Sequence, residues 1–294
     1  MTRSVWLPCL GFLLILFPSF ARAQENSRVL QLMASAEKAL DAGETTTALR
    51  LTDDALGITP QNAELLAFRA RVLAATHDYA GAISDADQVV KMAPKWVAAY
   101  DSRGSFRFMA GDFTGSLEDF DKSIELRPKS AAEHWQRGIS LYYAGKYEAG
   151  RDQFAAYQTL DGSDVENAVW HYLCNIKLVG KDQARQEIPA TKLDRRVPLM
   201  KVYALFKAET TVEDVVRAAQ DVGKTEEESR TRNFYANLYL GLYYVTEDQP
   251  GKALEHLKAA SIPAHEKSGY MWHVARIHAG LLEKEVADET TAKP

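Results

Sequence analysis

The sequence repeats with a period of 34 residues over residues 27–161. Three prolines, Pro60, Pro94 and Pro128, are spaced at this interval. Small residues recur at two other positions of the period, and each series has four members: Ala36, Ala70, Gly104 and Gly138, then Ala48, Ala82, Ser116 and Gly150. Such a period indicates that one supersecondary unit is built four times and that each unit buries its apolar face against its neighbours.

The length of the period and the residues at its fixed positions resemble the tetratricopeptide repeat (TPR), a pair of antiparallel helices. Proline cannot continue a helix, so it ends each unit. The turn between the two helices carries Gly43, Gly111 or Gly145, and His77 holds this position in the second unit. The sequence therefore predicts an all-α fold, a right-handed superhelical TPR solenoid, with four repeats over residues 27–161.

From residue 162 the period is lost, but helical patterns continue to residue 285. Four apolar residues at i, i+3, i+4 and i+7 predict an amphipathic helix: Leu199, Val202, Tyr203 and Phe206. A further TPR is predicted where five repeat positions return: Gly241, Tyr244, Ala253, Leu257 and Ala260. We expect degenerate helical repeats before this TPR, a capping helix over residues 269–283 after it, and a disordered tail over residues 286–294.

The first 23 residues have the pattern of a secretory signal peptide. Arg3 precedes an uncharged apolar run from Trp6 to Phe20, and Ala21-Arg22-Ala23 has the form of a cleavage site. The run is shorter than the ~20 residues that a membrane-spanning helix needs. We therefore expect cleavage after Ala23, a periplasmic or extracellular location and no stable membrane anchor. Retention of the segment as an uncleaved anchor is the alternative.

The composition and the motifs argue against several function classes. The net charge is −5, and no cluster of basic residues offers a nucleic-acid surface. No two histidines stand at i and i+4, and His273 and His278 are five apart, so we predict no metal site. The position of Cys174 favours buried packing between helices over a nucleophile. No G-x-S-x-G motif or phosphate loop is present, so we predict no catalytic residues, no cofactor and no enzyme activity.

Arginine recurs at the seventh position of repeats 2, 3 and 4. Aspartate stands 16 residues later in repeats 2 and 3, and 15 residues later in repeat 4. We predict Arg–Asp ion pairs between the two helices of each repeat, with an anion-binding stripe as the alternative. The pairs are Arg69 with Asp85, Arg103 with Asp119, and Arg137 with Asp152.

An aromatic and apolar stretch marks the candidate partner-binding groove. The resemblance to TPR proteins implies that the first helix of each repeat lines the groove. This gives six candidates from repeats 3 and 4: Phe108, Met109, Trp135, Ile139, Tyr142 and Tyr143. Apolar anchors of this kind suit a docked peptide or helix. The alternative is that these side chains pack against the C-terminal half of the chain, which would then fill its own groove.

Two stretches of the second half resemble the NlpI family of bacterial periplasmic TPR lipoproteins. They are Val169–Leu173 with Lys177-Leu178, and Asn233–Tyr235 continuing into Leu240–Tyr244. The resemblance implies an all-helical envelope scaffold that recruits peptidoglycan hydrolases and a processing protease. The chain departs from that family at Gln24, which cannot be acylated where the family has a cysteine, and a homodimer is left open.

These observations together predict a secreted or periplasmic protein–protein interaction scaffold or adaptor with protein or peptide partners. The second hypothesis is a subunit of a carbohydrate-active or other envelope enzyme, in which the aromatic stretch stacks on sugar. Two facing carboxylates near the aromatic residues would favour the enzyme, whereas polar groups that pair with a peptide backbone would favour the scaffold.

Overall fold

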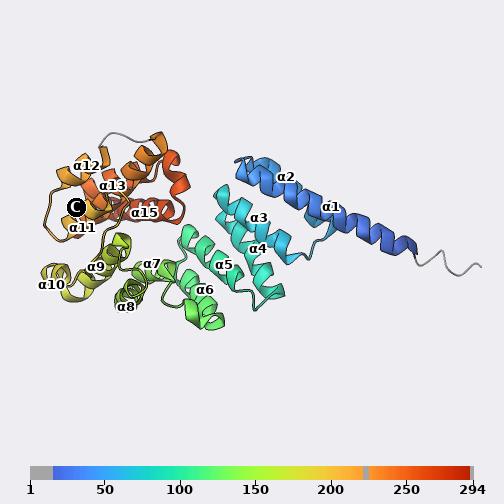
Figure 1. The fold of residues 1–294 in the computed structure, drawn as a ribbon, viewed down its shortest axis with the longest axis horizontal. Helices are drawn as coiled ribbons and strands as arrows, with labels where there is room; N and C mark the ends of the chain where they lie inside the picture. Colours follow the sequence, from blue (N-terminus) through green and yellow to red (C-terminus); the bar gives the residue numbers. More distant parts are fainter. Residues whose placement is uncertain (1–15, 221–224, 292–294) are drawn as a thin grey trace, which may run out of the picture. The chain divides into compact units, whose positions relative to one another are not determined.

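The computed structural model describes residues 16–220 and 225–291, and in these residues helices are joined by turns and loops without a β-strand (Figure 1). The chain forms two compact units, which divide between Ala99 and Tyr100, inside helix α5 (Val97–Ala110). We describe each unit by itself. The predicted all-α fold of helix-turn-helix repeats is confirmed.

The first unit contains two helix pairs. Helix α1 (Leu16–Asp41) packs on α2 (Thr45–Ile58), and α3 (Ala63–Ala75) packs on α4 (Tyr79–Met92). Helix α2 also packs on α3. The small residues at the repeat positions allow these close contacts: Ala36, Ala48, Ala70 and Ala82 are all buried.

The predicted turn position adopts the left-handed conformation in every repeat. At the three glycines φ is +78°, +88° and +71°, and at His77 it is +63°. Asp248 has φ of +55° at the matching position of the fifth repeat. Glycine adopts this region without strain, and His and Asp tolerate it better than most residues. The expectation that His77 replaces a turn glycine is therefore confirmed.

The second unit begins with two further repeats. Helix α5 is followed by α6 (Phe113–Leu126), and α7 (Trp135–Tyr143) is followed by α8 (Tyr147–Gln158). Helix α7 is shorter than the period predicts, because a 3-10 turn (Pro128–Ser130) and residues 131–134 precede it. The ring Nε2 of His134 lies 3.1 Å from a carboxylate oxygen of Asp101, and this contact holds the segment against α5.

Past the fourth repeat, four helices and a loop replace the regular pattern. They are α9 (Val165–Val179), α10 (Lys181–Gln186), α11 (Leu199–Phe206) and α12 (Val212–Gln220). Residues 187–198 form the loop between α10 and α11. The amphipathic helix predicted from Leu199 is present, and its four apolar residues are buried.

The predicted fifth repeat is the pair α13 (Glu226–Thr246) and α14 (Pro250–Ala260). Gly241 lets the two helices approach, because a Cβ there would lie 2.6 Å from Cγ of Leu257. A 3-10 segment (Pro263–Ser268) leads to the last helix, α15 (Tyr270–Thr291). Residues 286–291 are thus helical where we expected a disordered tail, and residues 292–294 lie outside the described residues.

Arginine–aspartate pairs join the paired helices in two repeats, as predicted. Arg69 binds Asp85 through two hydrogen bonds of 2.7 and 2.8 Å. Arg103 binds Asp119 at 2.5 and 2.9 Å. These pairs are partly buried and favour the structural role over an anion-binding stripe.

The pair predicted for repeat 4 is wrong. Arg137 donates to Asp121 at 2.6 Å and to Gln153 at 3.0 Å, whereas Asp152 binds Arg151. Asp152 stands one residue before the position that faces Arg137, so its side chain points elsewhere on α8. The acceptor Asp121 belongs to the preceding helix.

Cys174 packs between α8 and α9, as expected from its position. It is fully buried, and its Sγ would lie 2.8 Å from a Cβ at Gly150. Burial raises the pKa of the Cys174 thiol to about 12, so the thiolate that a nucleophile needs is strongly disfavoured.

The predicted signal peptide lies largely outside the described residues, which begin at Leu16. No helix in the part of the chain that the structure describes combines the length and the apolar character that a membrane span needs. The signal peptide and its cleavage stay predictions.

Candidate functional site

The C-terminal helix α15 covers much of the predicted groove. Tyr270 stacks on Phe108 with 4.8 Å between ring centroids. The hydroxyl of Tyr143 lies 2.9 Å from Nδ1 of His278, and Arg276 donates a 2.6 Å hydrogen bond to the carbonyl oxygen of Met109. Of the two alternatives for this stretch, these contacts favour packing against the C-terminal half.

The other three groove candidates divide between packing and an open cavity. Tyr142 is 8% exposed and meets the ring of Trp170 edge-on at 5.5 Å, so it belongs to the core. Trp135, which is half-buried, and Ile139 line a cavity of about 340 Å³. The role of the six candidates in partner binding stays a prediction. Of the two that line the cavity, Trp135 is half-buried and Ile139 is 1% exposed.

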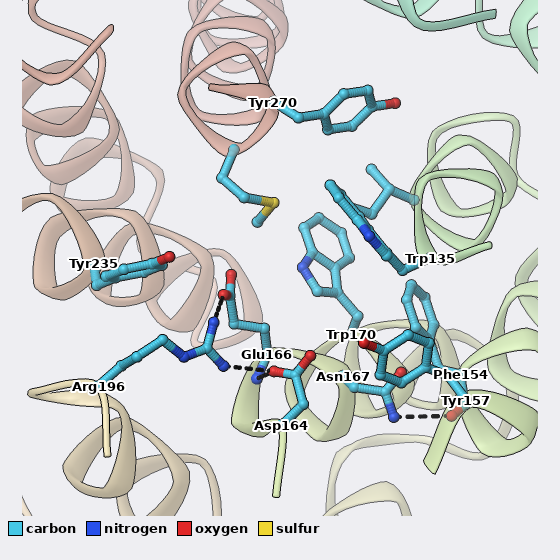
Figure 2. A pocket seen from close by; sticks show the side chains of 12 residues that line it. Trp135, Phe154, Tyr157, Asp164, Glu166, Asn167, Trp170, Arg196, Tyr235 and Tyr270 are labelled. Atoms are coloured by element: carbon cyan, nitrogen blue, oxygen red, sulfur yellow. Dashed lines mark hydrogen bonds and ion pairs between the residues drawn. The ribbon is translucent and has the colours of Figure 1, made fainter. Parts of the chain in front are cut away.

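The cavity is built by helices from both the repeats and the C-terminal part (Figure 2). Helices α7 and α8 supply one wall, α9 the floor, and α13 and α15 the opposite side. Its apolar lining comes from six residues: Trp135, Ile139, Phe154, Trp170, Tyr270 and Met271. Its polar lining includes Asp164, Glu166, Asn167 and Arg196.

Helix α9 determines how the polar and aromatic groups of the floor meet. Asp164 caps its N-terminus, because the carboxylate accepts a 3.0 Å hydrogen bond from the backbone N–H of Glu166. Glu166, Asn167 and Trp170 then follow at helical spacing and so share one face of α9. The carboxylate of Asp164 therefore lies at the edge of the face of α9 that carries the indole of Trp170.

Arg196, from the loop before α11, ties three carboxylates together. Its Nη2 donates to Asp164 at 2.7 Å and to Asp194 at 2.6 Å, and its Nη1 donates to Glu166. Burial lowers the pKa of the guanidinium, but the hydrogen bond to Asp194 and the charges of Glu166 and Asp164 raise it more. The pKa of Arg196 therefore lies above its ordinary value, and the residue stays a cation.

The two oxygens of Glu166 have different partners. One accepts from Arg196, and the other accepts a 2.5 Å hydrogen bond from the hydroxyl of Tyr239. Burial raises the pKa of the Glu166 carboxyl, and the opposing effects of Arg196 and Tyr239 only partly offset it. Both oxygens are thus held in place by the protein.

Three buried polar atoms of residues that line the cavity have no hydrogen-bond partner among the described residues. They are the indole Nε1 of Trp170, the amide oxygen Oδ1 of Asn167 and the hydroxyl oxygen of Tyr270. The other end of the Asn167 amide is satisfied, since Nδ2 donates to the carbonyl of Phe154 at 2.9 Å. Buried polar groups are nearly always paired, so the unpaired donor of Trp170 and the unpaired acceptor of Asn167 are candidate contacts for a ligand that displaces the side chains covering them.

Two neighbouring cavities share residues with the first. One, of about 610 Å³, lies between Tyr157 and Asp194 and shares Asp164 and Arg196 with the aromatic cavity. The next, of about 380 Å³, shares Arg196 and extends along the first turns of α13. Arg196 thus lines all three cavities.

Within the ranges that the structure describes, no group of three or more His, Cys, Asp or Glu side chains is arranged to hold a metal ion. Asp164 and Glu166 of the cavity and the nearby Asp194 all form ion pairs with Arg196.

The polar half of the cavity was not predicted from the sequence. Arg196 and Asp194 lie in a loop without period, and Tyr235 lies in a helix that we assigned to repeat packing. One local signal was present: Asp164, two residues before Glu166, has the form of a helix cap. Nothing in the sequence places the loop of Arg196 beside that cap.

No family model matches the chain, and no curated relative matches it. Among solved structures, a tetratricopeptide repeat protein from Parabacteroides merdae ATCC 43184 is 14% identical, with a TM-score of 0.56 over 87% of this chain and 99% of that one. A MamA protein is 15% identical, with a TM-score of 0.51 over 68% and 99%. MamA from Desulfovibrio magneticus RS-1 is 18% identical, with a TM-score of 0.51 over 54% and 90%.

Identities this low bear on the fold alone. The predicted resemblance of the second half to NlpI stays a prediction. The helix pairs, the left-handed turns and these similar structures together show that the chain has an all-α fold of the TPR solenoid class.

Proposed function

We propose that this chain is an exported, non-enzymatic interaction scaffold that binds a peptide segment of a protein partner in the aromatic cavity of its second unit. The proposal rests on two buried atoms of the cavity wall without a hydrogen-bond partner, the indole N–H of Trp170 and the amide oxygen of Asn167. A peptide backbone presents one C=O and one N–H at each non-proline residue, so it can satisfy both atoms.

The shape and the lining of the site support a peptide over a rounded small molecule. The aromatic cavity offers Trp135 and Tyr270 as walls for one side chain. The two other cavities that Arg196 lines would accept the parts of the peptide that flank this side chain. Aromatic anchors of this kind carry most of the binding energy at peptide interfaces.

The proposed location and partners rest on the sequence. The signal-peptide pattern over residues 1–23 supports export, and the resemblance of the second half to NlpI supports partners in the bacterial envelope, such as peptidoglycan hydrolases or a protease. We propose no stable membrane anchor, because the expected mature chain begins at Gln24 and not at an acylated cysteine.

Site-specific photo-crosslinking in the native organism tests the proposal. A photoreactive amino acid replaces Tyr235, which lines the cavity, and the crosslinked peptide is identified by mass spectrometry. We expect crosslinks to an exported protein, and we expect Trp135→Ala to remove them while the protein stays folded. A probe at Leu178, which is 41% exposed and does not line the cavity, is the control. Equal crosslinks from both probes, or crosslinks that survive Trp135→Ala, contradict the proposal.

One observation favours the second hypothesis, a carbohydrate-active site. Asp164 and Glu166 lie in a cavity with two tryptophans, and the pKa of Glu166 is raised, as in a general acid. However, both carboxylates bind the same guanidinium, and Glu166 has no oxygen left to protonate a leaving group. We therefore expect no release of products from peptidoglycan or chromogenic glycosides. Hydrolysis that Glu166→Gln abolishes would reverse the order of the two hypotheses.

A further inference from the structure

We propose that the aromatic cavity takes a basic side chain, lysine or arginine, from the bound peptide, and that Asp164 and the ring of Trp135 recognise its charge. This inference rests on the proposed function, because it names the residue type that a peptide would place in the cavity. It is drawn from the charge balance, the ring geometry and the unpaired atoms around the cavity.

The charge balance of the cavity disfavours an anionic ligand. The Nε, Nη1 and Nη2 atoms of Arg196 all donate to carboxylates, namely those of Asp194, Glu166 and Asp164. Three carboxylates thus surround one guanidinium. A phosphate or a carboxylate entering the cavity would meet this excess negative charge, whereas a cation would be attracted by it.

Asp164 is the carboxylate best placed to receive the cation. Its Oδ1 accepts hydrogen bonds both from the backbone N–H of Glu166, which forms the helix cap, and from Nη2 of Arg196. In Figure 2 the carboxylate of Asp164 lies between Arg196 and Asn167, and all three residues line the cavity. By contrast, Glu166 uses both of its oxygens inside the protein.

The aromatic lining suits a cation as well. The faces of tryptophan and tyrosine attract lysine and arginine within about 6 Å of the ring centroid. This interaction already occurs at the site, where the guanidinium carbon of Arg196 lies 5.8 Å from the ring centroid of Tyr235. Trp135, which is half-buried, supplies a further ring in the same cavity (Figure 2). The apolar stem of a basic side chain packs on such rings while its charged end reaches a carboxylate.

The unpaired atoms of the cavity wall favour a basic side chain that belongs to a peptide over a free cation. The indole N–H of Trp170 requires an acceptor, and Oδ1 of Asn167 requires a donor. A free diamine or a metal ion supplies no acceptor for the indole. A peptide that inserts a basic residue supplies the cation, a C=O and an N–H within one residue.

Model peptides test the inference. Acetylated and amidated peptides of sequence Gly-Ser-Leu-Xaa-Leu-Ser-Gly carry arginine, lysine, norleucine or glutamate at Xaa. Binding to the full chain is measured by calorimetry. We expect the arginine and lysine peptides to bind about tenfold more tightly than the norleucine peptide, and the glutamate peptide to bind most weakly. The preference for basic residues should shrink as salt is raised.

Asp164→Asn is the decisive variant. Asparagine caps a helix as well as aspartate does, so α9 keeps its cap while the charge is removed. We expect the preference for basic peptides to disappear and binding of the norleucine peptide to persist. The matched control is Asp112→Asn at the cap of α6, where Asp112 accepts from the N–H of Gly115 at 2.9 Å outside the cavity.

The possible outcomes separate this inference from the proposed function. Equal binding of all four peptides, each weakened by Trp135→Ala, overturns the basic preference and leaves the peptide site intact. Binding that ignores Trp135→Ala, or no binding of any peptide, overturns the proposed function and this inference with it. If Asp164→Asn does not fold, a basic preference in the native chain that is insensitive to salt overturns the inference.

Discussion

The pKa of His278 reflects the packing of α15 onto the repeats. It is buried, and its Nδ1 lies 2.9 Å from the hydroxyl of Tyr143. Burial, assisted by the nearby charge of Lys177, lowers the pKa of His278 to about 4. The folded protein therefore holds this ring neutral at a pH where an unfolded chain would protonate it.

This pKa makes the folded state sensitive to acid. The pKa of His278 is lower in the folded protein than in the unfolded chain. Its contribution to the unfolding free energy is therefore complete above about pH 6.5 and is lost as the pH falls toward 4. The loss amounts to about 3 kcal/mol of unfolding free energy for one group with this shift. We expect His278→Asn, which keeps an acceptor for Tyr143 but does not titrate, to flatten the fall in stability over this range.

Urea unfolding at half-unit steps from pH 4 to pH 8 measures this difference. The comparison uses the slopes and not the absolute stabilities, because asparagine is smaller than histidine and leaves a gap. Other groups with shifted pKa values, such as Glu166, titrate in both proteins and cancel in the comparison. Parallel curves for the two proteins would show that His278 does not carry the acid sensitivity.

At the level of helices, α15 closes one side of the second unit. Its first residue, Tyr270, stacks on Phe108 of α5 and meets Trp135 of α7 edge-on, with centroids 5.2 Å apart. The aromatic stretch that we considered an open groove is therefore partly an internal contact, and the cavity beside it owes a wall to the same tyrosine.

We expect Tyr270→Ala to destabilise the second unit by about 2–4 kcal/mol, because it removes two aromatic contacts and leaves a gap under α15. The matched control on the same helix is Leu281→Ala, which removes a side chain that is 41% exposed and should change stability by no more than about 0.5 kcal/mol. The denaturation midpoints of the two variants test this expectation. Similar midpoints for the two variants would mean that α15 contributes little to this unit.

The period in the sequence predicts the paired helices well, but it does not specify which residues the last helix contacts. A residue such as Gly145 must adopt a left-handed turn, and this local requirement repeats every 34 residues. By contrast, the contact of Tyr270 with Phe108 joins residues more than 160 positions apart, and no local propensity encodes it. For the same reason we identified Trp135 and Ile139, but not their position beside Arg196.

We did not predict the acceptors of Arg137 because we compared too few positions of the repeat. We compared only one position of the following helix, whereas Asp53 and Asp121 repeat at a second position, in the preceding helix. The structure uses this second series, since Arg69 donates to Asp53 and Arg137 to Asp121. Each of these two arginines thus links its own helix to the repeat before it, which the period alone could have shown.

For the whole molecule, the N-terminal segment connects the fold with the proposed export. Helix α1 continues across the predicted cleavage site after Ala23. Residues 22–28 are all exposed, and the first buried residue after them is Val29. The contacts that join α1 to α2 therefore begin well after the expected cleavage site, as the burial of Ala36 and Ala39 also shows.

We expect the exported protein to begin at Gln24 and to be as stable as the same chain with residues 16–23 attached. Arg22 and Ala23, which precede the cleavage site, are exposed, and the loss of exposed side chains alters stability by no more than about 0.5 kcal/mol. Intact-mass measurement of the protein purified from the native organism gives its first residue, and melting curves of the two forms compare their stability. A chain that retains Met1 to Ala23 in the exported fraction would show that the segment is kept as an anchor. A lower melting temperature after cleavage would show instead that the start of α1 packs on the first unit.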